Sequence, residues 1–319
     1  MRGSAETASR LRWLGYGACA LAGCLWGTGF YFGRLAINEM SVEYMVLYRF
    51  LFACVGLLPV AIMERVRLTW PETRLLLMAA VLGVPIQFLL QFHGLALTTV
   101  SHAALMVGTV PVLLAAAAAL FAGERLDVVG WLALFGSTVG VMLISLGGAR
   151  GPAGNEQPTL AGDMLIVFSL VLSIAWVLLS KKLMETHSPP AVTAYTILAG
   201  TAMLAGWTLG PRALLGWIPN HSAPMPFAHV SATAWMALAV SGLACTATTT
   251  LLWNWGIHHV PASRAGVFLN IEPALGSLLG VKLLGERLGP FAWLGGGLIL
   301  AAAITLTTRD HEEPAVILE

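Results

Sequence analysis

The sequence predicts an all-α membrane protein with ten transmembrane helices arranged as two inverted five-helix repeats. Three observations support this fold class: a high apolar content, a series of long apolar runs, and an internal repeat. Of the 319 residues, 57% are hydrophobic and only 10% are charged, whereas soluble domains carry about 25% charged residues. One water-soluble core cannot hide that much apolar surface at this chain length, so lipid is the expected solvent.

Ten apolar runs each have the ~20 residues that a helix needs to cross a ~30 Å hydrocarbon core. They cover about 13–32, 42–63, 75–95, 102–121, 128–146, 162–180, 191–210, 232–255, 264–284 and 291–307. The stretch 113–120 lacks the alternation of β-barrel strands, so helices are expected. The Gly- and Pro-rich segment 147–161 separates two predicted domains, 13–146 and 162–307.

The distribution of positive residues predicts the orientation. With the N-terminus in the cytoplasm, eleven Lys and Arg residues lie on the cytoplasmic side and five on the other. This bias favours a multi-pass protein of the cell (inner) membrane with both termini cytoplasmic. The net charge of +1 gives no basic patch for nucleic acid, and the four cysteines lack metal-ligand spacing. We therefore expect no metal, no cofactor and no nucleic-acid partner.

The strongest pattern is an internal repeat. A shift of 162 positions aligns residues 94–132 with 256–294 without a gap, and Gly123-Glu124-Arg125-Leu126 recurs as Gly285-Glu286-Arg287-Leu288. With five helices per half, equivalent helices cross the membrane in opposite directions. Such inverted repeats are typical of secondary transporters that work by alternating access around a site near the bilayer midplane.

Several short motifs resemble the EamA-type domain of the drug/metabolite transporter superfamily. In the first half they are Leu25-Trp26-Gly27, Tyr48-Arg49-Phe50, and Pro111 through "GERL"; in the second they are Gly162-Asp163, Ala175-Trp176, and Pro273 through "GERL". The resemblance spans roughly residues 13–307. It implies ten helices, cytoplasmic termini and export of small metabolites. Within the family, the chain resembles the YddG type, which handles aromatic amino acids.

Glu272 is the main candidate for a substrate-binding residue, because it lies near the middle of the ninth run and its repeat counterpart is the apolar Val110. A charge at the bilayer centre costs at least ~3 kcal/mol. We expect Glu272 to bind a substrate ammonium group or to take up a proton; the alternative is a structural carboxyl beside Pro273. The matched Pro111 and Pro273 are predicted to kink the helices that border the binding site, with plain packing kinks as the alternative.

Other candidates are grouped by helix face and by ring chemistry. Gln87 and Gln91 are four residues apart and share one face, and the eighth run has its own polar side. Aromatic rings suit flat apolar side chains or cations, with plain packing as the alternative. The predicted substrate-binding set is Trp26, Tyr31, Gln87, Phe88, Gln91, Trp176, Thr249, Trp253 and Glu272.

Four further features have structural interpretations. Arg49 is expected to pair with a carboxylate or to hydrogen-bond loop carbonyls. Glu124 and Glu286 are expected to face the start of the following helix and its dipole. The pairs Gly136/Gly140 and Gly276/Gly280 are expected to mark close helix packing.

These patterns favour a protein that is not an enzyme, because the sequence has no phosphate-binding loop, no Ser/His/Asp set and no paired catalytic carboxylates; a membrane enzyme with sparse motifs is the alternative. The predicted function is a secondary transporter that exports small metabolites, namely aromatic or other hydrophobic amino acids. The alternatives are a channel or receptor-like protein, or an exporter of drugs and amphipathic amines. The expected partners are a small-molecule substrate and the lipid bilayer, and ten helices in two halves can form a complete monomer.

Overall fold

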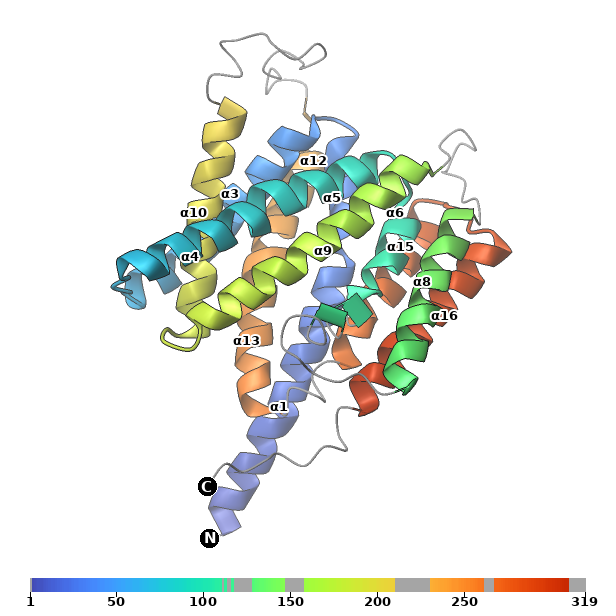
Figure 1. Ribbon diagram of the computed structural model, residues 1–319. Coiled ribbons are helices and arrows are strands. Elements are labelled where there is room, and N and C mark those ends of the chain that lie inside the picture. The colour runs from blue at the N-terminus through green and yellow to red at the C-terminus, as the bar shows by residue number, and fades with distance from the viewer. Residues whose placement is uncertain are drawn as a thin grey trace.

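The computed structural model describes residues 2–110, 112–113, 116–117, 128–146, 158–209, 230–260 and 267–309. These residues form ten helical segments packed side by side (Figure 1). In chain order the segments are α1 (Arg2–Gly27) with α2 (Gly29–Ile37); α3 (Val42–Met63); α4 (Trp70–Val81), η1 (Leu82–Ile86) and α5 (Gln87–Ala96); α6 (Val100–Val107); α8 (Val128–Leu146); α9 (Leu160–Leu183); α10 (Pro189–Leu209); α12 (Ala232–Gly242), η3 (Leu243–Thr248) and α13 (Thr249–His259); η4 (Val267–Asn270) and α15 (Ile271–Leu283); and α16 (Pro290–Arg309). The predicted all-helical class and the ten segments are confirmed, and the runs 42–63 and 128–146 coincide with α3 and α8.

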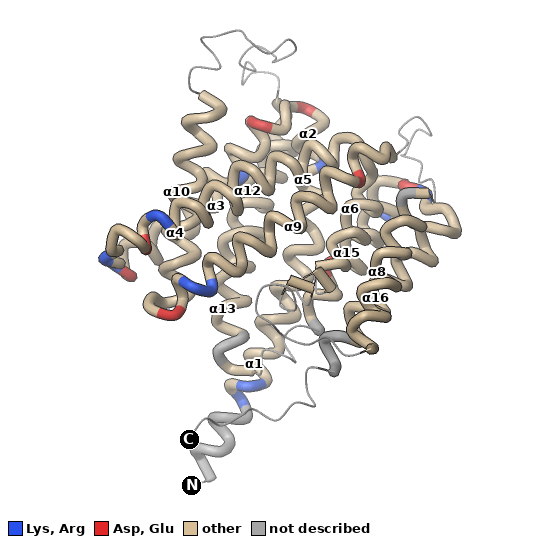
Figure 2. The backbone as a smooth tube through the Cα atoms, in the orientation of Figure 1, with Lys and Arg blue, Asp and Glu red and all other residues tan. Residues whose placement is uncertain are grey.

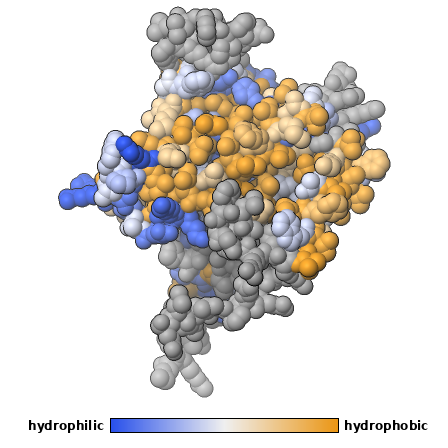
Figure 3. Space-filling view, viewed as in Figure 1, coloured by the Kyte–Doolittle hydropathy of each residue, from blue (hydrophilic) through white to orange (hydrophobic). Residues whose placement is uncertain are grey.

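The surface is that of a multi-pass membrane protein. Five of the described helical stretches are long and apolar enough to cross a bilayer: Val42–Met63, Trp70–Ala96, Leu160–Leu183, Pro189–Leu209 and Ala232–Gly256. Large apolar side chains such as Val55 and Phe135 are more than half exposed on the outside of the bundle. Apolar residues cover the middle of the visible face in Figure 3, whereas most charged positions in Figure 2 lie near the ends of helices. Lipid covers such a surface at little cost.

The third and eighth segments are interrupted at matching places. Each contains a π-helical stretch, η1 in the first half and η3 in the second, and the 162-residue shift carries 82–86 onto 244–248 inside η3. Pro85 lacks an amide hydrogen in η1. In η3 the hydroxyls of Thr246 and Thr249 donate to the carbonyls of Ser241 and Ala244. Short π segments redirect the side chains that follow and are frequent at functional sites.

The contacts between helices follow the same correspondence between the first and second halves of the chain. The contact of α1 with α13 has a counterpart in that of α9 with α5, and the contact of α1 with α15 has one in that of α9 with α6. The pairs α6–α15, α8–α16 and α3–α10 join equivalent helices of the two halves. Figure 1 shows α8 and α16 side by side at one edge. Each half therefore packs largely against its counterpart.

Glycines permit the closest of these contacts. An added Cβ at Gly140 would lie 2.7 Å from the Gly295 carbonyl oxygen, and one at Gly295 would lie 2.4 Å from that of Gly140. Gly276 and Gly280 abut Ala104 and Ser101 of α6, so close packing is confirmed for Gly140 and for both α15 glycines. The expectation for Gly136 is not met in the described part of the chain: no described atom lies within 4 Å of its added Cβ, one turn of α8 before Gly140.

Candidate functional site

Arg49 lies at the contact between the two halves. Its side chain extends from α3 and is 5% exposed, with the guanidinium carbon 5.2 Å from the ring centroids of both Phe88 and Phe92. Nε and Nη2 both donate to Thr246 Oγ1 at 3.3 Å. The Thr246 hydroxyl donates its own hydrogen to the Ser241 carbonyl and is thus left to accept. Arg49 therefore hydrogen-bonds a hydroxyl of a π segment, where a loop carbonyl or a carboxylate was expected.

The break in the first transmembrane segment lies against this arginine. α1 ends at Gly27 and α2 begins at Gly29, and Thr28 Oγ1 lies 3.1 Å from Cys245 Sγ of η3. An added Cβ at Gly29 would lie 3.8 Å from Arg49 Nη2. Small residues at the break bring the backbone close to the guanidinium group, as a site for a small ligand requires.

Glu272 approaches the same break from α15. An added Cβ at Gly27 would lie 3.1 Å from the Glu272 carbonyl oxygen, so the two backbones touch. The Glu272 side chain is partly exposed and forms no hydrogen bond or ion pair with the described residues. Arg49 borders the same break at Gly29. A positive group of the first half and a negative group of the second half thus face one break in the helix.

Two indole rings lie beside this charged pair. Trp26, directly before the break, and Trp253 of α13 have ring centroids 5.5 Å apart with planes tilted by 54°. Both rings are partly exposed. They supply apolar, π-rich surface next to Glu272, where cations and flat side chains are both favoured.

The remaining candidates have varied surroundings. Phe88 packs edge-on against Phe50 at 4.7 Å and belongs to the Arg49 cluster. Gln87 and Gln91 are buried, and Gln87 Oε1 has no hydrogen-bond partner among the described residues. The repeat shift pairs Gln87 with Thr249 and Gln91 with Trp253.

Three candidates lie away from the charged pair or are already engaged. Trp176 packs on Gly83 of η1. Tyr31 contacts Phe32. Thr249 is fully buried and its hydroxyl donates to Ala244. Their roles in binding, like those of the other candidates, stay predictions.

The proline pair is only partly visible. Pro273 is buried in the first turn of α15, directly after the 3-10 turn η4, where a missing amide hydrogen costs least. Pro111, like Glu124 and its "GERL" string, lies outside the described residues.

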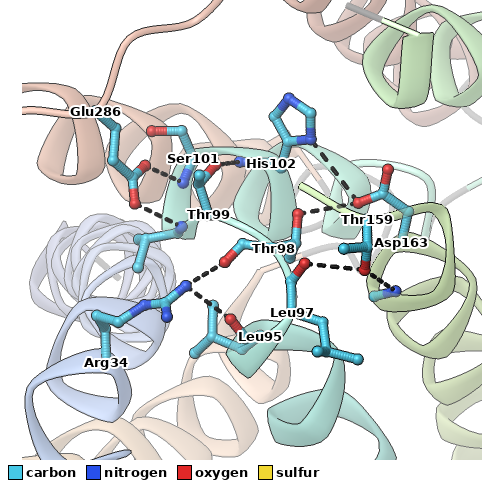
Figure 4. Close-up of polar contacts among 12 residues, drawn as sticks. Arg34, Leu95, Leu97, Thr98, Thr99, Ser101, His102, Thr159, Asp163 and Glu286 are labelled. Atoms are coloured by element: carbon cyan, nitrogen blue, oxygen red, sulfur yellow. Dashed lines mark hydrogen bonds and ion pairs between the residues drawn. The ribbon is translucent and has the colours of Figure 1, made fainter. Parts of the chain in front are cut away.

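A second polar cluster joins α2, α6, α9 and the turn before α16 (Figure 4). Arg34 donates to the carbonyl oxygens of Leu95 and Thr98. Glu286 accepts from the amides of Val100 and Ser101 at 2.7 Å each. The expectation that Glu286 faces the following helix is therefore wrong: it caps α6 of the other half, whose free amides attract a carboxylate.

This cluster was not identified from the sequence as a functional site. The available signal was the position of Arg34, His102 and Asp163 inside or beside apolar runs, where polar groups are costly. Their mutual proximity depends on helix contacts between the halves.

The fold and these buried groups define a multi-pass membrane transporter. The chain belongs to the EamA-like transporter family of the drug/metabolite transporter superfamily, which matches residues 13–146 and 160–308. Both halves match the same family, which supports a duplicated chain. The protein is accordingly a transporter and not an enzyme.

Known proteins similar to this chain share the description. An "Uncharacterized transporter" of Archaeoglobus fulgidus is 24% identical over 295 residues, covering 92% of this chain and 97% of its own length. The "Uncharacterized transporter YdfC" of Bacillus subtilis is 28% identical over 284 residues, covering 85% and 84%. The "Uncharacterized inner membrane transporter YedA" of Escherichia coli is 27% identical over 312 residues, covering 94% and 92%.

A solved crystal structure has the same fold. It superposes with a TM-score of 0.61 at 18% identity and covers 96% of this chain and 99% of that chain.

Proposed function

We propose that the protein is a secondary transporter in which two inverted five-helix repeats, 13–146 and 162–307, alternate access to a site between them. The paired π segments and the exchange of helix contacts between halves support a two-fold relation. An odd number of helices per half then inverts the second copy. Both termini lie in the cytoplasm, and the protein exports its substrate across the cell membrane.

The proposed substrates are amino acids with aromatic or other hydrophobic side chains, as for transporters of the YddG type. The observation that carries this proposal is the pair Arg49 and Glu272, groups of opposite charge from different halves that both border the α1–α2 break. A guanidinium group is suited to a carboxylate and a carboxylate to an ammonium group. Trp26 and Trp253 would contact the substrate side chain.

An exporter of amphipathic amines is the second candidate, because Glu272 beside two indoles also suits an organic cation. Arg49 distinguishes the two, since an amine without a carboxylate has nothing for a guanidinium group to bind. A channel would need neither charge at the contact between the halves.

Counterflow in proteoliposomes tests the proposal. Vesicles preloaded with unlabelled phenylalanine should accumulate external labelled phenylalanine transiently, with saturation and trans-stimulation. Phenethylamine, which lacks the carboxylate, should compete at least ~10-fold less well, the cost of one charge-assisted hydrogen bond. Equal competition would favour the amine exporter, and linear uptake without trans-stimulation would indicate a channel.

A further inference from the structure

The buried pair His102 and Asp163 is the feature that the transport site does not use. His102 on α6 is 0% exposed, Asp163 in the first turn of α9 is 1% exposed, and Nδ1 lies 3.8 Å from Oδ1. The pair lies at the helix ends where α5, α6 and α9 meet (Figure 4). Two titratable groups are thus sealed together at the boundary between the two halves.

Hydrogen bonds do not satisfy this pair. Asp163 Oδ1 accepts from Thr98 Oγ1 at 3.0 Å, but Asp163 Oδ2 and both nitrogens of His102 have no partner among the described residues. Buried polar atoms without partners are costly, and an isolated buried charge costs far more. With a neutral imidazole and an ionised carboxylate, the pair would carry one net negative charge. One added proton gives an imidazolium–carboxylate pair with no net charge.

The two neighbouring charges, Arg34 and Glu286, have opposite signs and cancel. The net charge of this region therefore depends on the proton of the His102–Asp163 pair. Arg34 of α2 donates to the Thr98 carbonyl, and Glu286 accepts from Val100 and Ser101 at the start of α6. Some titratable groups on the surrounding helices have partners of their own: His93 of α5 pairs with Glu43, Glu72 of α4 binds His187, Arg74 of α4 lies over Trp70, and Tyr195 of α10 binds Ala61. Others lie away from the pair: Lys282 of α15 is exposed, Glu272 lies near the α1–α2 break, and Lys181 and Lys182 are at the far end of α9.

The position of the pair connects its charge to the contact between the halves. The start of α9 is fastened to the turn before α6, because Thr159 donates to the Leu97 carbonyl through its amide and its hydroxyl. Gly94 and Gly162 allow the two backbones to touch there. Without the added proton, the net negative charge of the pair at this contact would need water to solvate it. Water can reach the pair only if α6 and α9 separate.

We propose that His102 and Asp163 form a proton-binding site that closes this end of the transporter when protonated and opens it when the proton is lost. The imidazole of His102 holds the proton and faces Asp163 Oδ1 across 3.8 Å, and the proton leaves to water as the end opens. The link to transport rests on the alternating-access function proposed above; proton binding itself does not.

The first experiment measures protonation directly. In protein labelled with ¹⁵N-histidine in lipid nanodiscs, the His102 signal, assigned by its loss in His102→Gln, should move between neutral and imidazolium positions within the range of about pH 5 to about pH 9. In Asp163→Asn this transition should change or disappear, because the charge partner is lost. A His102 signal that stays neutral throughout, or one unaffected by Asp163→Asn, would overturn the proposal.

The second experiment measures opening. Spin labels at the exposed positions Asn38, after α2, and Leu160, at the start of α9, are placed in a background with the native cysteines replaced by alanine. The distance between the two labels should be longer at about pH 8.5 than at about pH 5.5. Asp163→Asn, which removes the charge without removing an acceptor for Thr98, should keep the short distance at both pH values.

The matched control is His93→Gln, a partly exposed histidine on the adjacent α5. It should retain the full pH-dependent change, whereas His102→Gln should abolish it. A distance that does not change with pH, or a change that persists in His102→Gln, overturns the proposal. Neither measurement needs a substrate, so failure of phenylalanine counterflow would be a separate result.

Discussion

Single side chains in this transporter have roles that their immediate neighbours define. Arg49 is held by one hydroxyl and two aromatic rings, and Glu272 has no direct partner among the described residues. A carboxylate held at the contact between the halves without a partner is expensive. It is therefore the side chain whose neutralisation should affect transport most.

Glu272→Gln should lower amino-acid flux by about 10-fold or more, because a charge-assisted bond to the substrate ammonium becomes a neutral one. Initial rates of counterflow, corrected for the amount of protein in the vesicles, measure this effect. Glu185→Gln, at an exposed position at the end of α9, is the control and should transport normally. Normal flux in Glu272→Gln would remove this residue from the site.

Glu286→Gln should lower stability by about 1.5–3 kcal/mol, the contribution of hydrogen bonds to a charged group. The buried carboxylate caps Val100 and Ser101, and an amide accepts through only one oxygen. The midpoint of thermal unfolding in detergent measures the change. A midpoint equal to that of Glu185→Gln would contradict the capping role.

Helices in this protein are positioned by close contacts and by their caps. Glycines let backbones touch where a methyl group would not fit, which is the usual basis of helix association in lipid. The π segments η1 and η3 change the direction in which the side chains after them point. Both devices act on whole elements and can be tested by substitutions outside the candidate site.

Gly242→Ala should destabilise the contact of α12 with α3 by about 1–3 kcal/mol or more. The new Cβ would lie 2.3 Å from the Arg49 carbonyl oxygen and 3.0 Å from the Ala53 nitrogen, and backbone atoms cannot move aside cheaply. Gly206→Ala is the matched control, since no atom of the described residues lies within 4 Å of its added Cβ. Unfolding midpoints of the two variants in detergent should differ by several degrees; equal midpoints would show that the helices separate freely.

The start of α12 should weaken at low pH. Glu39, in the turn after α2, accepts from the amide and hydroxyl of Ser231, and these bonds hold the pKa of the Glu39 carboxyl below its ordinary value of 4.5. A lowered pKa means that the stabilisation is complete above the ordinary value and is lost as the pH falls through the lowered one. The difference in unfolding midpoint between the wild type and Glu39→Gln should therefore be constant above the ordinary value of 4.5 and shrink as the pH falls through the lowered pKa. A difference in unfolding midpoint that stays constant as the pH falls below 4.5 would contradict the prediction.

At the level of the complete chain, the two halves pack against each other through equivalent helices. Equivalent helices meet in pairs, and the charged groups proposed to bind substrate come one from each half. Inversion of the second half follows only if every segment crosses the bilayer. Topology is thus the decisive property of the whole molecule.

Cysteines at the repeat-equivalent positions Arg125 and Arg287 should be labelled from opposite faces of the membrane. Membrane-impermeant maleimide added to sealed, right-side-out vesicles should reach Arg287→Cys at once and Arg125→Cys only after permeabilisation. Cysteine at Arg67, in the turn between α3 and α4, should behave as Arg125→Cys does. Labelling of Arg125→Cys and Arg287→Cys from the same side would end the inverted-repeat proposal.

Local patterns in the sequence were sufficient for the helical segments and for the correspondence of the halves. Apolar run length decides whether a segment can cross a bilayer, so α3 and α8 were predicted to the residue. The repeated "GERL" string made the duplication visible. The importance of Glu272 could be proposed because a carboxylate in an apolar run is costly wherever it packs.

Only the tertiary structure decided which polar groups meet. Glu286 caps a helix nearly two hundred positions earlier, Arg49 binds Thr246 across the contact between the halves, and His102 lies beside Asp163. The reason is physical: insertion into lipid depends on the composition of each segment alone, whereas a hydrogen bond depends on the rotation and depth of two helices. Those are set by packing of small residues such as Gly27 and Gly276, which local composition does not reveal.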